Sequence, residues 1–130
     1  MAISRVKKPR FTIDDLLTGC VLNLEARNLA AQTILLYEQV LGYFKAFLVD
    51  RGCSTVAADI ERRHIQEWLR SLFEETSPRT GRPLTAVTVD IRFRTLRAFW
   101  NWAVHDGYVE ASPMRGVARP RLPSAPRPHF

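Results

Sequence analysis

The sequence has no apolar run long enough to cross a bilayer, and its first ten residues, MAISRVKKPR, lack the apolar stretch of a signal peptide. We therefore expect a cytoplasmic protein without a membrane partner. Cysteine is scarce too: Cys20 and Cys53 stand far apart, outside any C-x-x-C motif and without a histidine cluster. Such spacing argues against a metal site or a disulfide framework and predicts two free thiols.

Motifs that carry catalysis or bind a nucleotide are also missing. The sequence contains no Walker loop, no glycine-rich dinucleotide fingerprint and no acidic metal cluster. The three tyrosines, Tyr37, Tyr43 and Tyr108, fall at positions expected in the core or in a turn. We therefore expect no cofactor and no enzymatic activity in this chain.

Positive charge is abundant and unevenly distributed. The formal net charge is +6, made up of +4 in residues 1–10, −4 in residues 11–76 and +6 in residues 77–130. Basic ends around an acidic middle are typical of a protein that binds a polyanion. The same pattern also fits a solvated surface with basic tails, and charge alone does not separate the two.

Helical periodicity is the other strong signal. Apolar residues recur every three or four positions in four segments, and we found neither a strand signal nor an internal repeat. The first predicted helix follows the N-cap Thr12 and runs to about Arg27, and the second ends before Gly52. The third spans about 62–75, and the fourth begins near Thr85 and ends at Gly107.

The pattern predicts an all-α fold, a compact bundle of four principal helices. We expect a flexible basic arm at 1–11, the helical domain at 12–112 and a linker or tail rich in proline and arginine at 113–130. Glycine and proline make 76–85 a loop. The predicted core face of the fourth helix contains Val89, Phe93, Leu96, Trp100 and Ala103, and that of the third contains Ile65, Trp68, Leu69 and Leu72.

Two segments resemble the paired helices of the core-binding, SAM-like domain of tyrosine recombinases, the phage-integrase family. The first, NLAAQTILLYEQVLGYFKAFLVDRG, matches the family pattern at Leu29, Thr33, Ile34, Tyr37, Leu41, Phe44, Phe47, Leu48 and Gly52. The second, LTAVTVDIRFRTLRAFWNWAVHDGYVEASPM, matches at Leu84, Thr88, Val89, Arg92, Leu96, Arg97, Phe99, Trp100, Gly107 and Pro113. The stretch RGVARPRLP is similar to the family's interdomain linker, so the resemblance covers about 11–123.

The chain departs from the family pattern where each of these helices begins. The family's Ser-Pro pair is replaced by Ala30-Ala31 in the first segment, which weakens that helix cap, and by Thr85-Ala86 in the second. The family's asparagine and first arginine in the second segment are Asp90 and Ile91 here.

The resemblance implies a domain that clamps duplex recombination-site DNA, with the catalytic arginines, histidines and tyrosine in a separate domain after the linker. Other recombinase protomers would be partners of the full-length protein, and the isolated domain would be a monomer. Side chains suited to phosphate or base contacts then define the candidate site. These residues are Gln32, Thr33, Lys45, Arg79, Arg82, Thr85, Thr88, Arg92, Arg94, Thr95 and Arg97.

An alternative is a helical protein–protein interaction module. A second apolar stripe, Leu36, Val40, Tyr43 and Phe47, runs along the second helix and could contact a partner helix instead of the core. A helix-turn-helix regulator is disfavoured, because no pair of short helices around a tight glycine turn is found.

Overall fold

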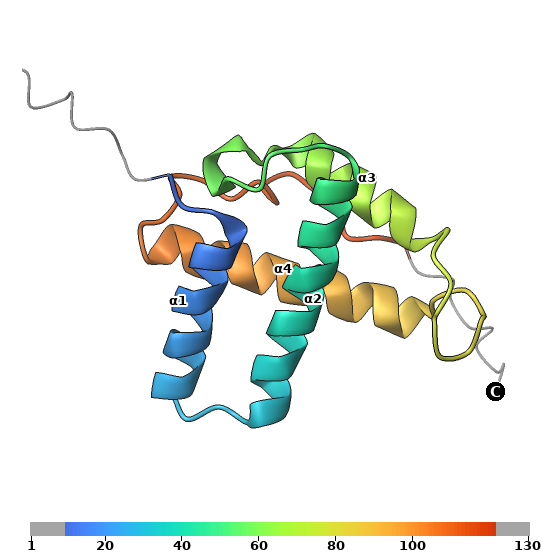
Figure 1. Cartoon of the computed structure of the whole chain (residues 1–130), viewed down its shortest axis with the longest axis horizontal. Coiled ribbons are helices and arrows are strands. Elements are labelled where there is room, and N and C mark those ends of the chain that lie inside the picture. Colours follow the sequence, from blue (N-terminus) through green and yellow to red (C-terminus); the bar gives the residue numbers. More distant parts are fainter. Residues whose placement is uncertain (1–9, 122–130) are drawn as a thin grey trace, which may run out of the picture.

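The computed structural model describes residues 10–121, and their fold is all-α (Figure 1). Four helices follow one another as α1 (Ile13–Ala26), α2 (Ala31–Asp50), α3 (Arg62–Leu72) and α4 (Ala86–His105), with a short 3₁₀ turn, η2 (Ala57–Asp59), before α3. Within the described residues the only β-pairings are two isolated bridges, Thr12 with Val56 and Thr76 with Pro83. The predicted four-helix, all-α fold is therefore confirmed.

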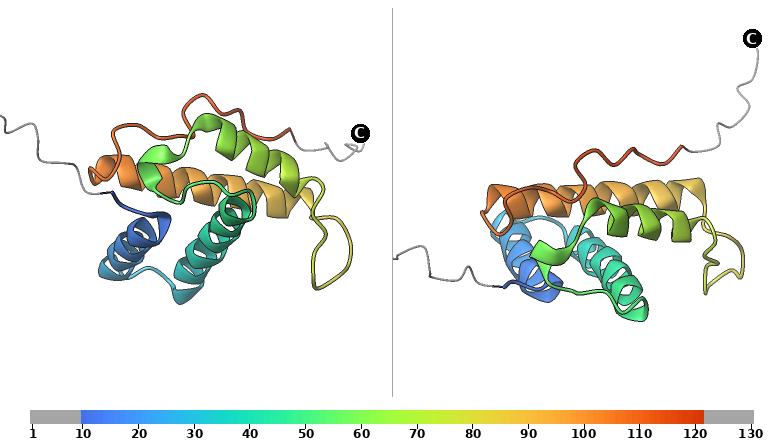
Figure 2. Two further views of the ribbon diagram at one scale, coloured as in Figure 1. Left: turned by 45° about the horizontal axis from the view of Figure 1, so that its top comes forward. Right: turned by 90° about the horizontal axis from the view of Figure 1, so that it is seen from above.

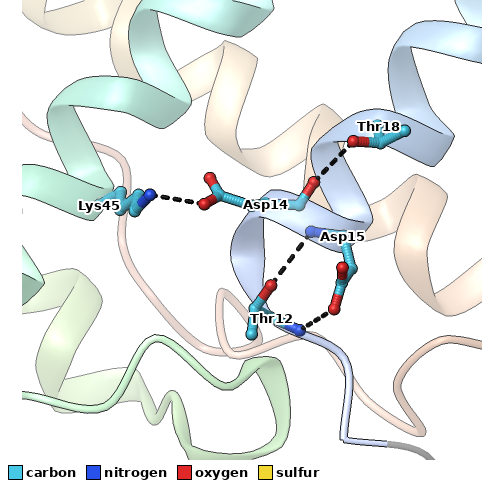
Figure 3. Close-up of polar contacts among 5 residues, drawn as sticks. All are labelled: Thr12, Asp14, Asp15, Thr18 and Lys45. Carbon is cyan, nitrogen blue, oxygen red and sulfur yellow. Dashed lines mark hydrogen bonds and ion pairs between the residues drawn. The ribbon is translucent and has the colours of Figure 1, made fainter.

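Thr12 caps α1 as the sequence predicts. Its hydroxyl accepts a hydrogen bond from the Asp15 backbone N–H at 3.2 Å, and the Asp15 carboxylate accepts one from the Thr12 N–H at 2.9 Å (Figure 3). This reciprocal pair satisfies two N–H groups that a helix start leaves unpaired. By contrast, Ala30 precedes α2 without any side-chain hydrogen bond, as the missing serine of the sequence pattern predicts.

The helices α1 and α2 form an antiparallel hairpin that lies across α4, while α3 covers another side of α4 (Figures 1 and 2). The core forms where these helices meet. All nine residues predicted for the core faces of α3 and α4 are buried, and α1 and α2 add Leu16, Cys20, Leu41, Phe44 and Leu48 among others. Burial of these side chains is the main force that holds the helices together.

The end of α3 differs from the prediction. The sequence pattern extends this helix to Glu75, but α3 ends at Leu72. The backbone N–H of Glu74 bonds to the Ser71 carbonyl in a tighter turn, and the Glu75 carbonyl accepts a hydrogen bond from Leu84, on the far side of the loop. The chain thus leaves the helix early because Glu75 closes the following loop.

The segment after α4 folds back onto the helices. The Tyr108 ring packs against Phe11 and Trp102, with centroid distances of 4.9 and 5.2 Å, and this contact anchors the turn after α4 to the domain. Farther along, Met114 is buried, and the Arg62 side chain donates a hydrogen bond to the Arg115 carbonyl at 3.0 Å. We call residues 113–121 the strap.

The strap is the described part of the predicted linker at 113–130, and it packs on the domain. Its return path brings it back along α4 (Figure 2). Residues 122–130 of the predicted linker and residues 1–9 of the predicted basic arm lie outside the described residues. The boundaries proposed at 12 and 112 stay predictions.

Both cysteines are free thiols, as predicted. Cys20 is 1% exposed on α1, and burial raises the pKa of its thiol to about 11, with a further contribution from the charge of Asp106. Cys53 is partly exposed beyond the end of α2. Within residues 10–121, no helix has the length and apolar character needed to cross a membrane.

Candidate nucleic-acid interface

The loop between α3 and α4 carries two exposed arginines on a closed turn. The Ser77 N–H donates to the Arg82 carbonyl at 2.7 Å, and the Gly81 N–H donates to the Ser77 carbonyl at 2.8 Å. At the base, the Leu84 N–H donates to the Glu75 carbonyl at 3.2 Å. We call residues 76–84 the arginine loop; it projects beyond the helices at one end of the molecule (Figure 2).

Arg79 and Arg82 are exposed on this loop, and neither guanidinium forms an ion pair within residues 10–121. The loop holds its own shape through backbone hydrogen bonds, so it does not need these side chains for its fold. Two unpaired positive charges on a fixed turn can bind phosphate oxygens, and arginine suits this role because its planar fork donates several hydrogen bonds.

The arginine loop leads directly into the start of α4. Thr85 is the N-cap: its hydroxyl accepts from the Thr88 N–H at 3.2 Å, and the two hydroxyl oxygens are 2.9 Å apart. A helix start carries partial positive charge and further N–H groups without an intrahelical partner. Thr85, Thr88, Arg79 and Arg82 therefore gather at one end of the molecule, and this end favours anions.

Arg92, one turn farther along α4, is buried and paired within the domain. Only 7% of the surface of Arg92 is exposed to solvent. The guanidinium donates to the Glu75 carboxylate at 2.9 Å and lies 4.2 Å from the centre of the Tyr43 ring on α2. Thr95, on the same side of α4, is also buried. Reading a base edge needs an exposed side chain, so this arrangement does not favour Arg92 and Thr95 as base readers, and their DNA contact stays a prediction.

Arg94 does reach the surface, with its side chain 54% exposed, but it is paired. Its guanidinium lies 3.0 Å from the Asp90 carboxylate one turn earlier on α4. Asp90 also receives two hydrogen bonds from Arg119 of the strap. The Arg119 hydrogen bond in particular holds the pKa of the Asp90 carboxyl below its ordinary value of 3.8, with Arg94 adding to the effect.

Arg97 is exposed on the same helix, and its guanidinium lies 5.2 Å from the Phe93 ring. It forms no ion pair within the described part of the chain. Arg97 and Arg115 line an open pocket near the strap, together with apolar side chains that include Val104 and Met114. Arg97 therefore faces the strap side of α4.

The candidate residues on α2 fall in two separate places on the helix. Lys45 faces α1, because its ammonium bonds to the Asp14 carboxylate at 2.5 Å (Figure 3). Gln32 is exposed and Thr33 partly exposed in the first turn of α2, whose N-terminal half extends away from the crossing with α4 (Figure 1). The structure thus separates Lys45 from the other candidate side chains.

Gln39 on α2 is a further candidate residue that was not predicted from the sequence. Gln32, Gln39 and Tyr43 are spaced by seven and four residues and share one helix face. Tyr43 contacts Arg92 of α4, so this face lies on the α4 side of the helix. Gln39 is exposed there. Its amide could have been found from this seven-residue spacing to Gln32.

The apolar stripe of the alternative hypothesis is largely occupied within the domain. Val40 is buried, and Leu36 and Phe47 pack against the core. Tyr43 keeps an exposed fraction of 46%, but its ring lies against the Arg92 guanidinium. Little of the stripe is left to meet a partner helix.

Comparisons with known proteins identify a matching family and a related protein. The profile of a family described as the phage integrase SAM-like domain matches residues 21–119. A tyrosine recombinase XerC from Oceanobacillus iheyensis is 29% identical over 104 residues, which make up 80% of this chain and 31% of that protein. The chain thus spans about a third of the length of this curated relative. No solved structure matches the chain.

Proposed function

The chain belongs to the phage integrase SAM-like domain family, the N-terminal helical domain of tyrosine recombinases, and from this membership we propose that it binds duplex DNA at a recombination core site. In this proposal the domain clamps the duplex for integration or recombination. In the same proposal, strand cleavage is the task of the catalytic domain of a full-length recombinase, and other recombinase protomers bind the neighbouring sites.

The observation that carries the proposal is the pair of unpaired arginines next to a capped helix start. Arg79 and Arg82 stand on a loop closed by its own backbone, immediately before Thr85 and Thr88. Phosphate contacts of this kind set the position of a protein on the duplex, while base contacts give specificity. We assign the base contacts to the exposed amides Gln32 and Gln39 and the phosphate contacts to the arginine loop and the α4 start.

Arg94 and Arg97 have a smaller part in this proposal. Arg94 is partly neutralised by Asp90, and Arg97 faces the strap side of α4. Both still add positive potential, which attracts the duplex over a distance of about one Debye length. We expect the isolated domain to be a monomer with a dissociation constant of about 10⁻⁴ to 10⁻⁶ M, the usual non-specific range.

The test is a salt titration of duplex binding with two charge-matched double variants. Arg79→Ala with Arg82→Ala removes the proposed contacts. Arg51→Ala with Arg63→Ala removes two exposed arginines at the end of α2 and the start of α3, so the net charge falls equally. The slope of log affinity against log salt should drop by about 0.9 for each lost phosphate contact in the first variant.

The control variant should keep the slope of the wild type. Equal slopes in the two double variants would contradict the proposed site, and a wild-type domain that binds no duplex at low salt would contradict the proposed function. Amide shifts in a titration with labelled protein should map to 79–88 and to the Gln32 and Gln39 face of α2.

A further inference from the structure

We infer that Arg92 is a positioning residue: it holds the arginine loop against α2 and α4, so that Arg79 and Arg82 stand ready for phosphate. This inference rests on the proposed function and gives Arg92 an indirect role in it. The family pattern places an arginine at this position of α4, and the sequence alone suggests a DNA contact. The geometry points to an indirect role.

The first argument is the environment of the Arg92 charge. The side chain is 8% exposed, and its guanidinium bonds to Glu75 at 2.9 Å while its carbon centre lies 4.2 Å from the Tyr43 ring. A buried charge is stable only when it is paired, and an aromatic face adds further attraction. Arg92 thus connects α4 with α2 and with Glu75, the residue immediately before the arginine loop.

The second argument is the position of Glu75. Its carboxylate binds Arg92, and its backbone carbonyl accepts the hydrogen bond from Leu84 that closes the base of the loop. One residue therefore fixes both the orientation and the closure of the loop. The loop is joined to the helices at its two ends, and Glu75 connects it to the interior through a charged side chain.

A fixed loop has a direct consequence for binding. Ordering a mobile segment on association costs conformational entropy, and a loop that is already held in place avoids much of that cost. Arg79 and Arg82 make no ion pair of their own in the described chain, so their positions depend on the loop backbone. Arg92 supports binding through that backbone without contact to DNA.

The two roles predict opposite effects for the removal of Glu75. If Arg92 contacts DNA directly, Glu75 competes with phosphate for it, and Glu75→Ala frees Arg92 and strengthens binding. If Arg92 positions the loop, Glu75→Ala loosens the loop and weakens binding. Loss of a negative charge strengthens binding in either case, so the comparison needs a variant with the same change of charge.

Glu74→Ala is the matched control. Glu74 is the neighbouring residue, is exposed, and has no side-chain hydrogen bond or ion pair in the part of the chain that the structure describes. We expect Glu75→Ala to bind a short duplex more weakly than Glu74→Ala by up to about fivefold, the effect of losing one partly exposed ion pair. Stronger binding by Glu75→Ala than by Glu74→Ala would overturn the inference.

Hydrogen exchange of the loop amides gives a second readout that needs no DNA. The Leu84 and Ser77 amides donate the hydrogen bonds that close the loop. Their exchange should be up to about fivefold faster in Glu75→Ala, and in Arg92→Lys, than in Glu74→Ala. Unchanged exchange in both variants would overturn the inference, even if the wild-type domain bound no duplex and the proposed function failed.

A double-mutant cycle completes the test. In the background of Arg79→Ala with Arg82→Ala, a positioning residue has nothing left to position. Arg92→Lys should then cause no further loss of affinity, whereas a direct contact would give an additive loss. Additivity would therefore contradict the inference, and non-additivity would support it.

Discussion

Arg119 of the strap forms a bidentate ion pair with Asp90 of α4, and both nitrogen–oxygen distances are 2.7 Å. The two residues are 29 positions apart in the chain. Arg94 approaches the same carboxylate at 3.0 Å, so one acid holds two arginines from different segments. This arrangement links the strap to the helix that begins at the proposed DNA site.

We expect the stabilising effect of Asp90 to depend on pH. Because the folded-state pKa of its carboxyl lies below the ordinary value of 3.8, the ionised form is favoured by folding. The contribution is therefore complete above about pH 4 and disappears as the pH falls through the lowered pKa. Urea unfolding of wild type and Asp90→Asn should show a difference at neutral pH that shrinks in acid.

Glu38→Gln is the control for this pH series. Glu38 is an exposed carboxyl on α2 with no ion pair among residues 10–121. Its removal should leave the free energy of unfolding within about 0.5 kcal/mol of the wild type. A difference between wild type and Asp90→Asn that stays constant from neutral pH to acid would contradict the role of the carboxylate.

Asp90→Asn should also strengthen non-specific DNA binding. Asp90→Asn removes a negative charge and weakens the hold on Arg94, whose side chain is already half exposed. The slope of log affinity against log salt should then become steeper by about 0.9 if Arg94 gains a phosphate contact. Asp106→Asn removes the same charge at the other end of α4, and an equal change of slope there would argue against Arg94.

Gly116 should tolerate alanine poorly. Its φ of +79° is costly for a residue with a side chain, and an added Cβ would lie 2.8 Å from the Arg62 guanidinium. Gly52 has a similar φ of +67° with nothing within 4 Å of an added Cβ, so it isolates the backbone cost. We expect about 1–2 kcal/mol of destabilisation for Gly52→Ala.

Gly116→Ala should cost more than Gly52→Ala by about 0.5–1 kcal/mol, because Arg62 must move and lose its hydrogen bond to the Arg115 carbonyl. Chemical denaturation measures both free energies of unfolding. Equal losses in the two variants would show that the Arg62 contact contributes nothing to stability.

Thr12→Ala should destabilise the domain by about 1 kcal/mol, because it removes the side chain that caps α1. Thr18 offers a matched comparison on the same helix, since its hydroxyl only donates back to the Asp14 carbonyl at 3.0 Å (Figure 3). We expect Thr18→Ala to change the free energy of unfolding by less than about 0.5 kcal/mol. A smaller loss for Thr12→Ala than for Thr18→Ala would rule out the capping role.

Leucine truncation should separate the core from the surface. Leu96 is fully buried on α4, and Leu96→Ala should cost about 2–5 kcal/mol of unfolding free energy through lost burial and the remaining cavity. Leu22 on α1 is 66% exposed, and Leu22→Ala should change stability by less than about 0.5 kcal/mol. Thermal and urea unfolding of both variants measure this difference.

The helices could be predicted because their signals are local. The step of three and four residues places Val89, Phe93 and Leu96 on one face whatever surrounds the helix, and Thr12 caps α1 through a bond that spans three residues. The early end of α3 could not be foreseen in this way. It depends on a hydrogen bond between Glu75 and Leu84, whose closure requires the folded loop.

The candidate site was less predictable than the helices, because arginine can be either free or paired. Arg79 and Arg82 follow from composition, since a loop that contains proline and glycine but no acid of its own leaves them exposed. Arg92 does not, because its partners Glu75 and Tyr43 come from two other segments of the chain. Arginine is mostly exposed in proteins, so its burial appears only in the folded structure.

Cys20 and Cys53 differ in exposure, so the reactivity of the buried thiol can report local opening of the domain. A reagent that needs the thiolate will reach Cys53 readily, but Cys20 must first leave the core and lose the burial that holds its pKa at about 11. After Cys53 is blocked, the labelling rate of Cys20 measures how frequently α1 separates from the helices packed against it. The labelling rate of this native cysteine therefore reports the frequency of transient opening without an engineered residue.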